Sequence, residues 1–382
     1  MSAFWISKIL AFAIALFCAL GMTPILVWCE RKICAWVQDR VGPNRVGLGM
    51  LSVFGFKGAD KIRLWGLGQP LADAIKLLSK ENIFPAGADK KVFLIAPLFT
   101  FLTAFLMFAA IPFGPPLTQG GHTYAFQIAD LGVGLLFILA VGSLAAYGTS
   151  FGGWASNSKY SLLGGVRASA QMISYEIAMI LAIITIVMIN QSVNLGDIAQ
   201  AQSGTYWLFD RIPIPEWNVF TINGFIAFCI FLPCMYAENN RLPFDLAECD
   251  AELVGGFHTE YSAMKFGLFF MGEYIGVTVM TMLLVTLFLG GYNLPWFDIG
   301  QHAHDAGSLP VQVLWCLLGF VVLFTKSFLF TLLSIQVRWT LPRFRYDQLM
   351  RLGWQGLIPA SLANLLFAAV WLQFNLAWSM HV

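Results

Sequence analysis

Eight long apolar runs alternate with polar segments along the chain. They cover roughly residues 5–28, 92–112, 129–149, 171–190, 219–236, 263–290, 311–335 and 357–378. Each run is near the ~20 residues that a helix needs to cross a bilayer. The first is too long for the apolar core of a secretory signal and lacks a clear cleavage site, so we expect it to stay as an anchor. The pattern predicts an all-α integral membrane protein of about eight transmembrane helices, forming one domain over residues 1–382.

Composition and charge agree with this prediction and give it an orientation. The chain is 58% hydrophobic and only 11% charged, and a soluble chain could not bury so much apolar surface. Lysine and arginine concentrate in segment 30–91 and in the loops after the third, fifth and seventh runs, whereas the loops at 113–128, 191–218 and 291–310 contain only Arg211. Because basic loops stay on the cytoplasmic side, we expect both termini on the opposite side.

Segment 30–91, the first cytoplasmic loop, is too long to be a bare linker. Within it, apolar and charged residues recur at helical spacing over residues 69–81. This pattern predicts an amphipathic helix with Pro70 near its start. One stripe of this helix is apolar and the other is charged: Leu71, Ala74, Ile75 and Leu78 against Asp73, Lys76 and Lys80. Such a helix can lie in the plane of the membrane interface or pack on its own protein, and the two alternatives are compatible.

The second cytoplasmic segment of interest, 237–261, is strongly acidic. It places six carboxylates around one cation, Arg241: Glu238, Asp245, Glu248, Asp250, Glu252 and Glu260. Crowded carboxylates repel, so some are expected to hold protons near neutral pH. If the segment is helical, Asp245, Glu248 and Glu252 share one face. A solvated acidic loop is the alternative, but interleaved apolar residues favour a structured, partly buried loop.

Glu176, Glu273 and Lys326 are charged residues that lie five or more residues inside an apolar run. Charges within a membrane are costly and by default indicate function. The alternative is structural pairing within the bundle, for instance between Glu176 and Lys326. Taken together, the three favour a polar path.

Other chemistry is sparse. A net charge of +1 indicates no nucleic-acid partner, and the seven cysteines contain no C-x-x-C pair. His302 and His304 lie near Asp298 and Asp305, where a solvated outer loop is favoured over a metal site. We therefore expect no metal, flavin or haem in this chain, and any electrons would come from another subunit.

Four motifs in order resemble one known family. They are Glu30-Arg31-Lys32 with Gly42-Pro43-Asn44, then Ser156 to Tyr160 through Ser174-Tyr175-Glu176, then Glu238 to Tyr261, and finally Arg338 to Leu349. The family is the H subunit of proton-pumping NADH:quinone oxidoreductase, called subunit 1 in mitochondrial respiratory complex I. The likeness spans nearly the whole chain, although Asp250 stands where the family usually has Glu.

The resemblance implies a quinone chamber shared with neighbouring subunits and a proton path. The implied chamber residues are Arg31, Arg40, Asp73, Lys76, Arg241 and Arg338. The implied proton-relay residues are Glu81, Glu176, Glu238, Asp245, Glu248, Asp250, Glu252, Glu260, Glu273 and Lys326. Quinone, either ubiquinone or menaquinone, is the implied substrate, with flavin and iron–sulfur clusters only in the peripheral-arm subunits. Antiporter-like and small membrane subunits and membrane lipid are the other implied partners.

The resemblance also places the chain in the bacterial inner membrane, with the mitochondrial inner membrane as the weaker alternative. Three other functions are compatible with parts of the sequence. The membrane subunit of an energy-converting hydrogenase shares the fold but reduces no quinone. A secondary transporter would need inverted halves, which the sequence lacks. A purely structural anchor leaves Glu273 and Lys326 unexplained.

Overall fold

The structure is a computed structural model that describes residues 2–47, 65–208, 212–247 and 250–379. Seven of its helices are long and apolar enough to cross a membrane. They run through 3–37, 90–110, 134–155, 159–190, 263–288, 309–340 and 346–374. The fifth apolar run, predicted over 219–236, forms the shorter helix α8 (Ile222–Glu238), whose 17 residues lie at the lower limit for spanning. The all-α membrane class is confirmed, with seven rather than eight helices of full spanning length.

The long helices are assembled from these elements in chain order. The first spanning run joins α1 (Ser2–Leu16), a π-helical turn (Phe17–Gly21) and α2 (Met22–Val37). The next runs are α4 (Lys90–Leu106) with its 3₁₀ extension (Met107–Ala110), α5 (Gly134–Ala155) and α6 (Lys159–Asn190). The last are α10 (Ala263–Phe288), α12 (Leu309–Thr340), and α13 (Tyr346–Arg351) continuing through a π-helical turn (Leu352–Leu357) into α14 (Ile358–Ser379).

The first helix continues well past the predicted end of its apolar run. Glu30, Arg31 and Lys32 were expected to open the loop, but they lie inside α2, which ends at Val37. The helix therefore carries these charged side chains on ordered backbone, and Glu30 and Lys32 are buried.

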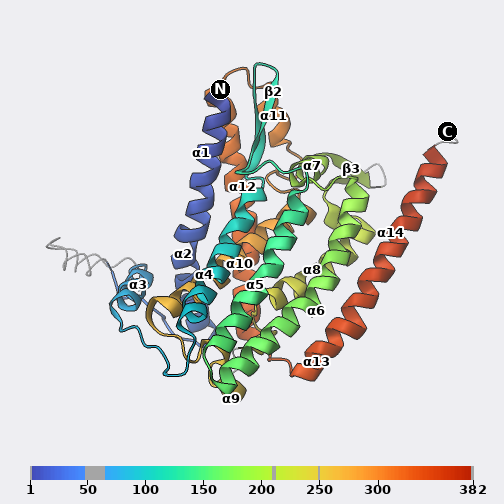
Figure 1. Cartoon of the computed structure of the whole chain (residues 1–382). Coiled ribbons are helices and arrows are strands. Elements are labelled where there is room, and N and C mark those ends of the chain that lie inside the picture. The colour runs from blue at the N-terminus through green and yellow to red at the C-terminus, as the bar shows by residue number, and fades with distance from the viewer. Residues whose placement is uncertain (1, 48–64, 209–211, 248–249, 380–382) are drawn as a thin grey trace.

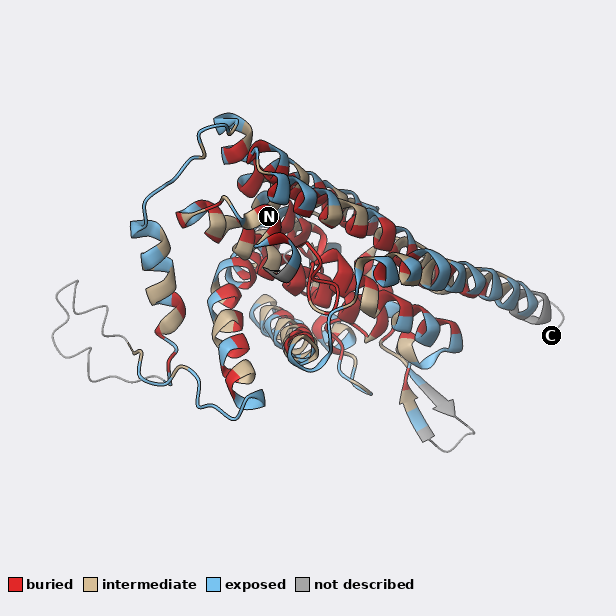
Figure 2. Ribbon diagram, turned by 90° about the horizontal axis from the view of Figure 1, so that it is seen from below, coloured by how far each residue is buried: buried red, intermediate tan, exposed pale blue. Residues whose placement is uncertain are grey.

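The amphipathic helix expected at 69–81 is confirmed as α3 (Gln69–Ser79), with Pro70 in its first turn, where its missing N–H costs nothing. Leu71 and Leu78 of its apolar stripe remain exposed. In Figure 2, α3 stands apart from the main bundle. These exposed leucines favour the alternative in which α3 lies at a membrane interface.

One end of the bundle carries short elements that the all-α prediction did not include. Two antiparallel hairpins lie there, β1 (Gly114–Gln119) with β2 (His122–Phe126) and β3 (Thr205–Leu208) with β4 (Ile212–Pro215). The short helices α7 (Leu195–Ala201) and α11 (Ile299–Asp305) and a 3₁₀ turn (Asn218–Phe220) accompany them. Figure 1 shows these elements and both termini at the same end, with α3 and the short helix α9 (Asp250–Leu253) at the other.

Helix α10 is the centre of the bundle. Of its most apolar window, 78% is buried, against 17% for the last spanning run, which includes α14. Each end of α10 is attached by a lysine. At the α3 end, Lys265 donates to the carbonyl of Ile83 at 3.1 Å and lies over the ring of Phe84. At the hairpin end, Lys326 of α12 donates to carbonyls just past the end of α10.

Candidate functional site

A buried ion cluster joins α2, α10, α12 and the loop after α8. Glu30 accepts hydrogen bonds from Arg241 at 3.1 Å, from Arg338 at 2.5 Å and from the hydroxyl of Tyr274. The Arg241 Nε atom lies 2.6 Å from Glu273. Only 5% of the Arg241 side chain and 10% of the Glu30 side chain are exposed. Burying an ion pair is costly unless its hydrogen bonds are satisfied, so this network is a strong candidate for function.

A tight turn after α8 aims Arg241 into the cluster. The Arg241 N–H donates to the carbonyl of Tyr236, and Asn240 adopts a left-handed conformation at φ 49°. Gln171 of α6 holds this turn, since its amide donates to the carbonyls of Ala237 at 2.8 Å and Phe244 at 2.7 Å. A buried glutamine thus satisfies backbone carbonyls that would otherwise be stranded.

The surroundings of the cluster keep Arg241 charged and disfavour the charge on Asp245. Burial opposes the charge on Arg241, but Glu273, Tyr274 and Glu30 outweigh it and hold the pKa of Arg241 well above its usual value. Burial raises the pKa of Asp245 above that of a solvated aspartate, although Arg343, 3.2 Å away, partly offsets this. Burial therefore disfavours the charged form of Asp245.

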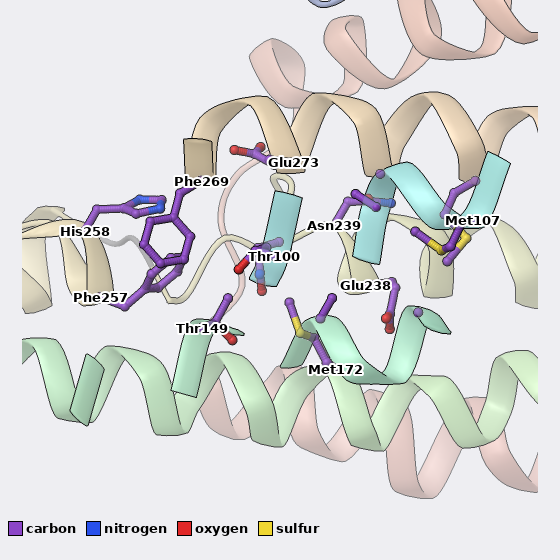
Figure 3. Close-up of a pocket in the computed structure, with 17 residues that line it drawn as sticks. Thr100, Met107, Thr149, Met172, Glu238, Asn239, Phe257, His258, Phe269 and Glu273 are labelled. Atoms are coloured by element: carbon purple, nitrogen blue, oxygen red, sulfur yellow. The ribbon is translucent and has the colours of Figure 1, made fainter. Parts of the chain in front are cut away.

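An inner cavity of about 60 Å³ lies between α4, α5, α6, α8 and α10. It has room for a few water molecules. Figure 3 shows Glu238, Asn239 and Met107 at one end and His258 with Phe257 and Phe269 at the other. Glu273 also lines it, and the Oε2 atom of Glu238 is buried with no hydrogen-bond partner among the described residues. Two carboxylates, Glu238 and Glu273, therefore line one cavity.

His258 closes the aromatic end of this cavity. Its ring packs 3.9 Å from Phe257, 5.2 Å from Phe269 and 5.4 Å from Phe266, measured between ring centroids. Burial lowers the pKa of His258 to about 3, so the imidazole is neutral at physiological pH.

A larger side cavity of about 450 Å³ lies between α2, α3 and α10. That volume is within the range of small-molecule sites. Arg31 and Asp73 pair across its rim at 2.6 Å and tie α2 to α3, while Lys76 and Lys80 line the same rim. Its remaining walls are largely apolar, with Val27 of α2 and Phe270 of α10 among them.

Helix α10 separates the two cavities. Phe270 and Met271 line the side cavity, whereas Gly272 and Glu273 line the inner one. Glu273 is also bonded to Arg241 of the ion cluster. One turn of α10 therefore touches both cavities and the buried charges.

The structure brings together only some of the expected chamber and relay residues. Arg31, Asp73 and Lys76 lie at the side cavity, Arg241, Arg338 and Glu273 in the ion cluster, and Glu238 and Glu273 at the inner cavity. Arg40 is exposed and bonded to Gln38, outside both cavities. Glu81 is exposed, and its backbone carbonyl accepts from Ser262 at 3.5 Å.

The acidic loop does not form the single helical face considered above. Asp245 lies outside helix α9 (Asp250–Leu253) and has no helical conformation, and it pairs with Arg343. Glu252 is half-exposed and pairs with Arg167 at 2.6 Å, and Glu260 is half-buried beyond the cavities. Glu248 lies outside the described residues, as does the side chain of Asp250.

Pairing between Glu176 and Lys326 is wrong. Glu176 of α6 accepts a hydrogen bond from Ser143 of α5 and lies close enough to Glu238 for their like charges to interact. Lys326 instead donates to the carbonyls of Leu289 at 2.7 Å, Gly291 at 3.2 Å and Asn293 at 2.5 Å. Its ammonium caps the hairpin end of α10 and does not line the inner cavity.

Several important residues were not among the sequence-based site predictions: Glu30, Gln171, Asn239, His258, Tyr274 and Arg343. Glu30 had a visible signal, because a carboxylate adjoining a long apolar run is costly. Tyr274 also had a visible signal in the sequence, since it directly follows Glu273, a charged residue inside an apolar run. The contacts of Gln171 and Arg343 are with residues distant in the sequence, so only the folded structure reveals their roles. Within the described residues, no group of three His, Cys, Asp or Glu side chains is arranged to hold a metal ion.

The fold and these cavities define a multi-pass membrane protein with a buried charge network. The sequence profile of the NADH dehydrogenase family matches residues 9–369. The first NADH-quinone oxidoreductase H subunit of Geobacter metallireducens is 47% identical over 354 residues, 93% of each chain. The second H subunit of Geobacter sulfurreducens is 46% identical over 95% of each chain, and the H subunit of Flavobacterium johnsoniae is 42% identical over 98%.

The chain belongs to this family, the membrane-embedded H subunit of NADH-quinone oxidoreductase. The resemblance drawn from the four motifs is thereby confirmed.

Proposed function

We propose that the chain forms part of the quinone chamber of a bacterial NADH-quinone oxidoreductase and couples quinone reduction to proton movement. The observation that carries this proposal is the shared turn of α10, which lines the side cavity with Phe270 and Met271 and the inner cavity with Glu273. The names of the relatives favour this function over that of a hydrogenase-type assembly, which reduces no quinone.

The side cavity is the proposed route by which quinone enters from the membrane. Its apolar walls suit an isoprenoid tail, and Arg31, Asp73 and Lys76 mark the rim at the level of α3. Electrons would come from iron–sulfur clusters in the peripheral-arm subunits. Reduction of a quinone to a quinol by two electrons also consumes two protons, so the chamber needs a nearby proton source.

The ion cluster is the proposed link between that reaction and the inner cavity. Added negative charge near Arg241 and Arg338 would compete with Glu30 and Glu273 for the same cations. Weakening either pair favours protonation of the released carboxylate, because its compensating charge is lost. Glu273 would then exchange a proton through the inner cavity with Glu238, beside which Glu176 lies.

The remaining acids of the predicted relay take a less direct part. Asp245, with a raised pKa beside Arg343, is proposed as a proton-holding group at the cluster's edge. Glu81, Glu252 and Glu260 lie at or near the surface of the bundle end that carries α3 and α9. Partner subunits of the complex would cover this surface. Lys326 is reassigned from the relay to a cap on α10.

The test is Arg241→Ala in the intact complex, in native membranes. Removing one partner of a buried ion network costs about 3–5 kcal/mol, so we expect NADH-driven quinone reduction to fall at least tenfold. NADH oxidation by an artificial acceptor should be unchanged, because it bypasses the chamber. Arg351→Ala is the matched control, since Arg351 is exposed and bonds to Gln355, one turn further along the chain. Quinone reduction at the native rate in Arg241→Ala would contradict the proposal, and equal loss of both activities would indicate failed assembly.

A further inference from the structure

The rim of the side cavity carries more positive charge than its own acid can balance. Arg31, Lys76 and Lys80 line it, against one carboxylate, Asp73. Asp73 pairs with a single Arg31 nitrogen, and an arginine has five N–H donors. Within the described part of the chain, neither Lys76 nor Lys80 has a carboxylate partner. Lys76 lies in the last turn of α3 and Lys80 directly follows the helix, and both side chains line the cavity.

Below this rim the cavity is apolar and elongated. Leu20, Pro24, Val27 and Arg31 follow one another along a single face of α2 and the turn before it. From residue 20 to residue 31 a helix rises roughly 16 Å, about half of the ~30 Å hydrocarbon core of a bilayer. Phe270 and Met271 of α10 form the opposite wall. The groove is therefore about one leaflet deep, apolar along its length and basic at one end. These features match the acyl chain and the headgroup of an anionic lipid.

We propose that the side cavity binds an anionic phospholipid, with its phosphate between Arg31, Lys76 and Lys80 and an acyl chain against α2 and α10. The charge of the rim carries this choice of occupant. A quinone that enters through the same cavity is neutral and does not compensate the charge of this rim, whereas a phosphate at the rim accepts hydrogen bonds from arginine and lysine together. The site does not depend on the proposed quinone reaction, because lipid binding can be measured with no turnover.

The experiment uses the purified complex and phosphatidylglycerol with a photoreactive group on its acyl chain. In the native complex, we expect crosslinks in peptides that contain residues 20–27 and 264–271. Lys80→Gln should weaken phosphatidylglycerol binding about fivefold, as expected for one lysine beside an anionic lipid. The double variant Lys90→Gln/Lys91→Gln is the matched control, because both lysines are exposed at the start of α4 and neither lines the cavity.

The other occupants are outcomes of the same experiment. Crosslinking of phosphatidylcholine equal to that of phosphatidylglycerol, or an unchanged affinity in Lys80→Gln, would overturn the proposal and leave an unselective apolar groove. Protection by inorganic phosphate at equal concentration would overturn it too, because it would show a simple anion site rather than a lipid site. Retained artificial-acceptor activity in Lys80→Gln would show that a lost crosslink is not a loss of assembly.

Discussion

Arg241 shows how much one side chain can organise when water is excluded. It contacts Glu30 and Glu273 and lies 4.3 Å from the ring centroid of Tyr274. Arginine suits this position because its guanidinium stays charged when buried and can serve two carboxylates in fixed directions. A lysine would offer one compact charge in place of the fork, so Arg241→Lys is not a conservative change here.

His258 gives a prediction about pH. Its folded-state pKa is about 3, below the ordinary value of 6.5. Above pH 6.5 neither state binds the proton, whereas between pH 6.5 and 3 only the unfolded state does, so stability falls as pH falls through this window. At pH 5 the loss is about 2 kcal/mol relative to pH 7. His258→Phe should therefore show a smaller drop in half-inactivation temperature between pH 7 and pH 5 than the native complex.

The measurement is quinone reduction assayed at pH 7 after heating at either pH. His122→Phe is the control, since His122 is exposed on the β1–β2 hairpin. Equal drops in the native complex and in His258→Phe would rule out this histidine as the source of acid sensitivity.

At the scale of elements, the contact between α6 and the acidic loop is set by a missing side chain. A Cβ atom on Gly164 would lie 2.7 Å from the Cα of Gly256 and 2.8 Å from the N of Phe257. Both neighbours are backbone atoms, so the loop itself would have to move. Small residues at such contacts let membrane helices approach their neighbours closely.

Gly164→Ala should therefore displace the segment that carries Phe257 and His258. We expect a cost of about 1–3 kcal/mol, as for other overpacked sites, and a clear loss of quinone reduction with artificial-acceptor activity retained. Gly132→Ala is the matched control, because its Cβ would meet nothing within 4 Å. Native quinone turnover in Gly164→Ala would show that the loop has room to adjust.

The elements were easier to predict than the contacts between them. Apolar runs located the spanning helices, and periodicity located α3, because both signals are local. The extension of α2 to Val37 was missed because charged residues end an apolar run without ending a helix. The ion cluster was harder still, since Glu30 meets partners 211 and 308 residues away in the sequence. No local pattern could reveal which of the many acids Arg241 would contact.

At the scale of the whole molecule, the orientation in the membrane is a prediction from loop charge. In a background with all seven cysteines replaced, Thr123→Cys on the β1–β2 hairpin should react with a membrane-impermeant maleimide in intact spheroplasts. Lys90→Cys at the start of α4 should react only after the membrane is opened, because Lys90 is exposed and basic loops stay inside. The reverse labelling pattern would invert the proposed topology.

The two lysines at the ends of α10 have a mechanical consequence. Lys265 is fixed by the Ile83 carbonyl and the Phe84 ring, and the carbonyls past the other end are held by Lys326. Sliding the helix by one turn, about 5.4 Å, would break both attachments at once. These two attachments therefore oppose a sliding motion of α10. We expect any coupling between the side cavity and the inner cavity to depend on shifted protons and reoriented side chains rather than on sliding of α10.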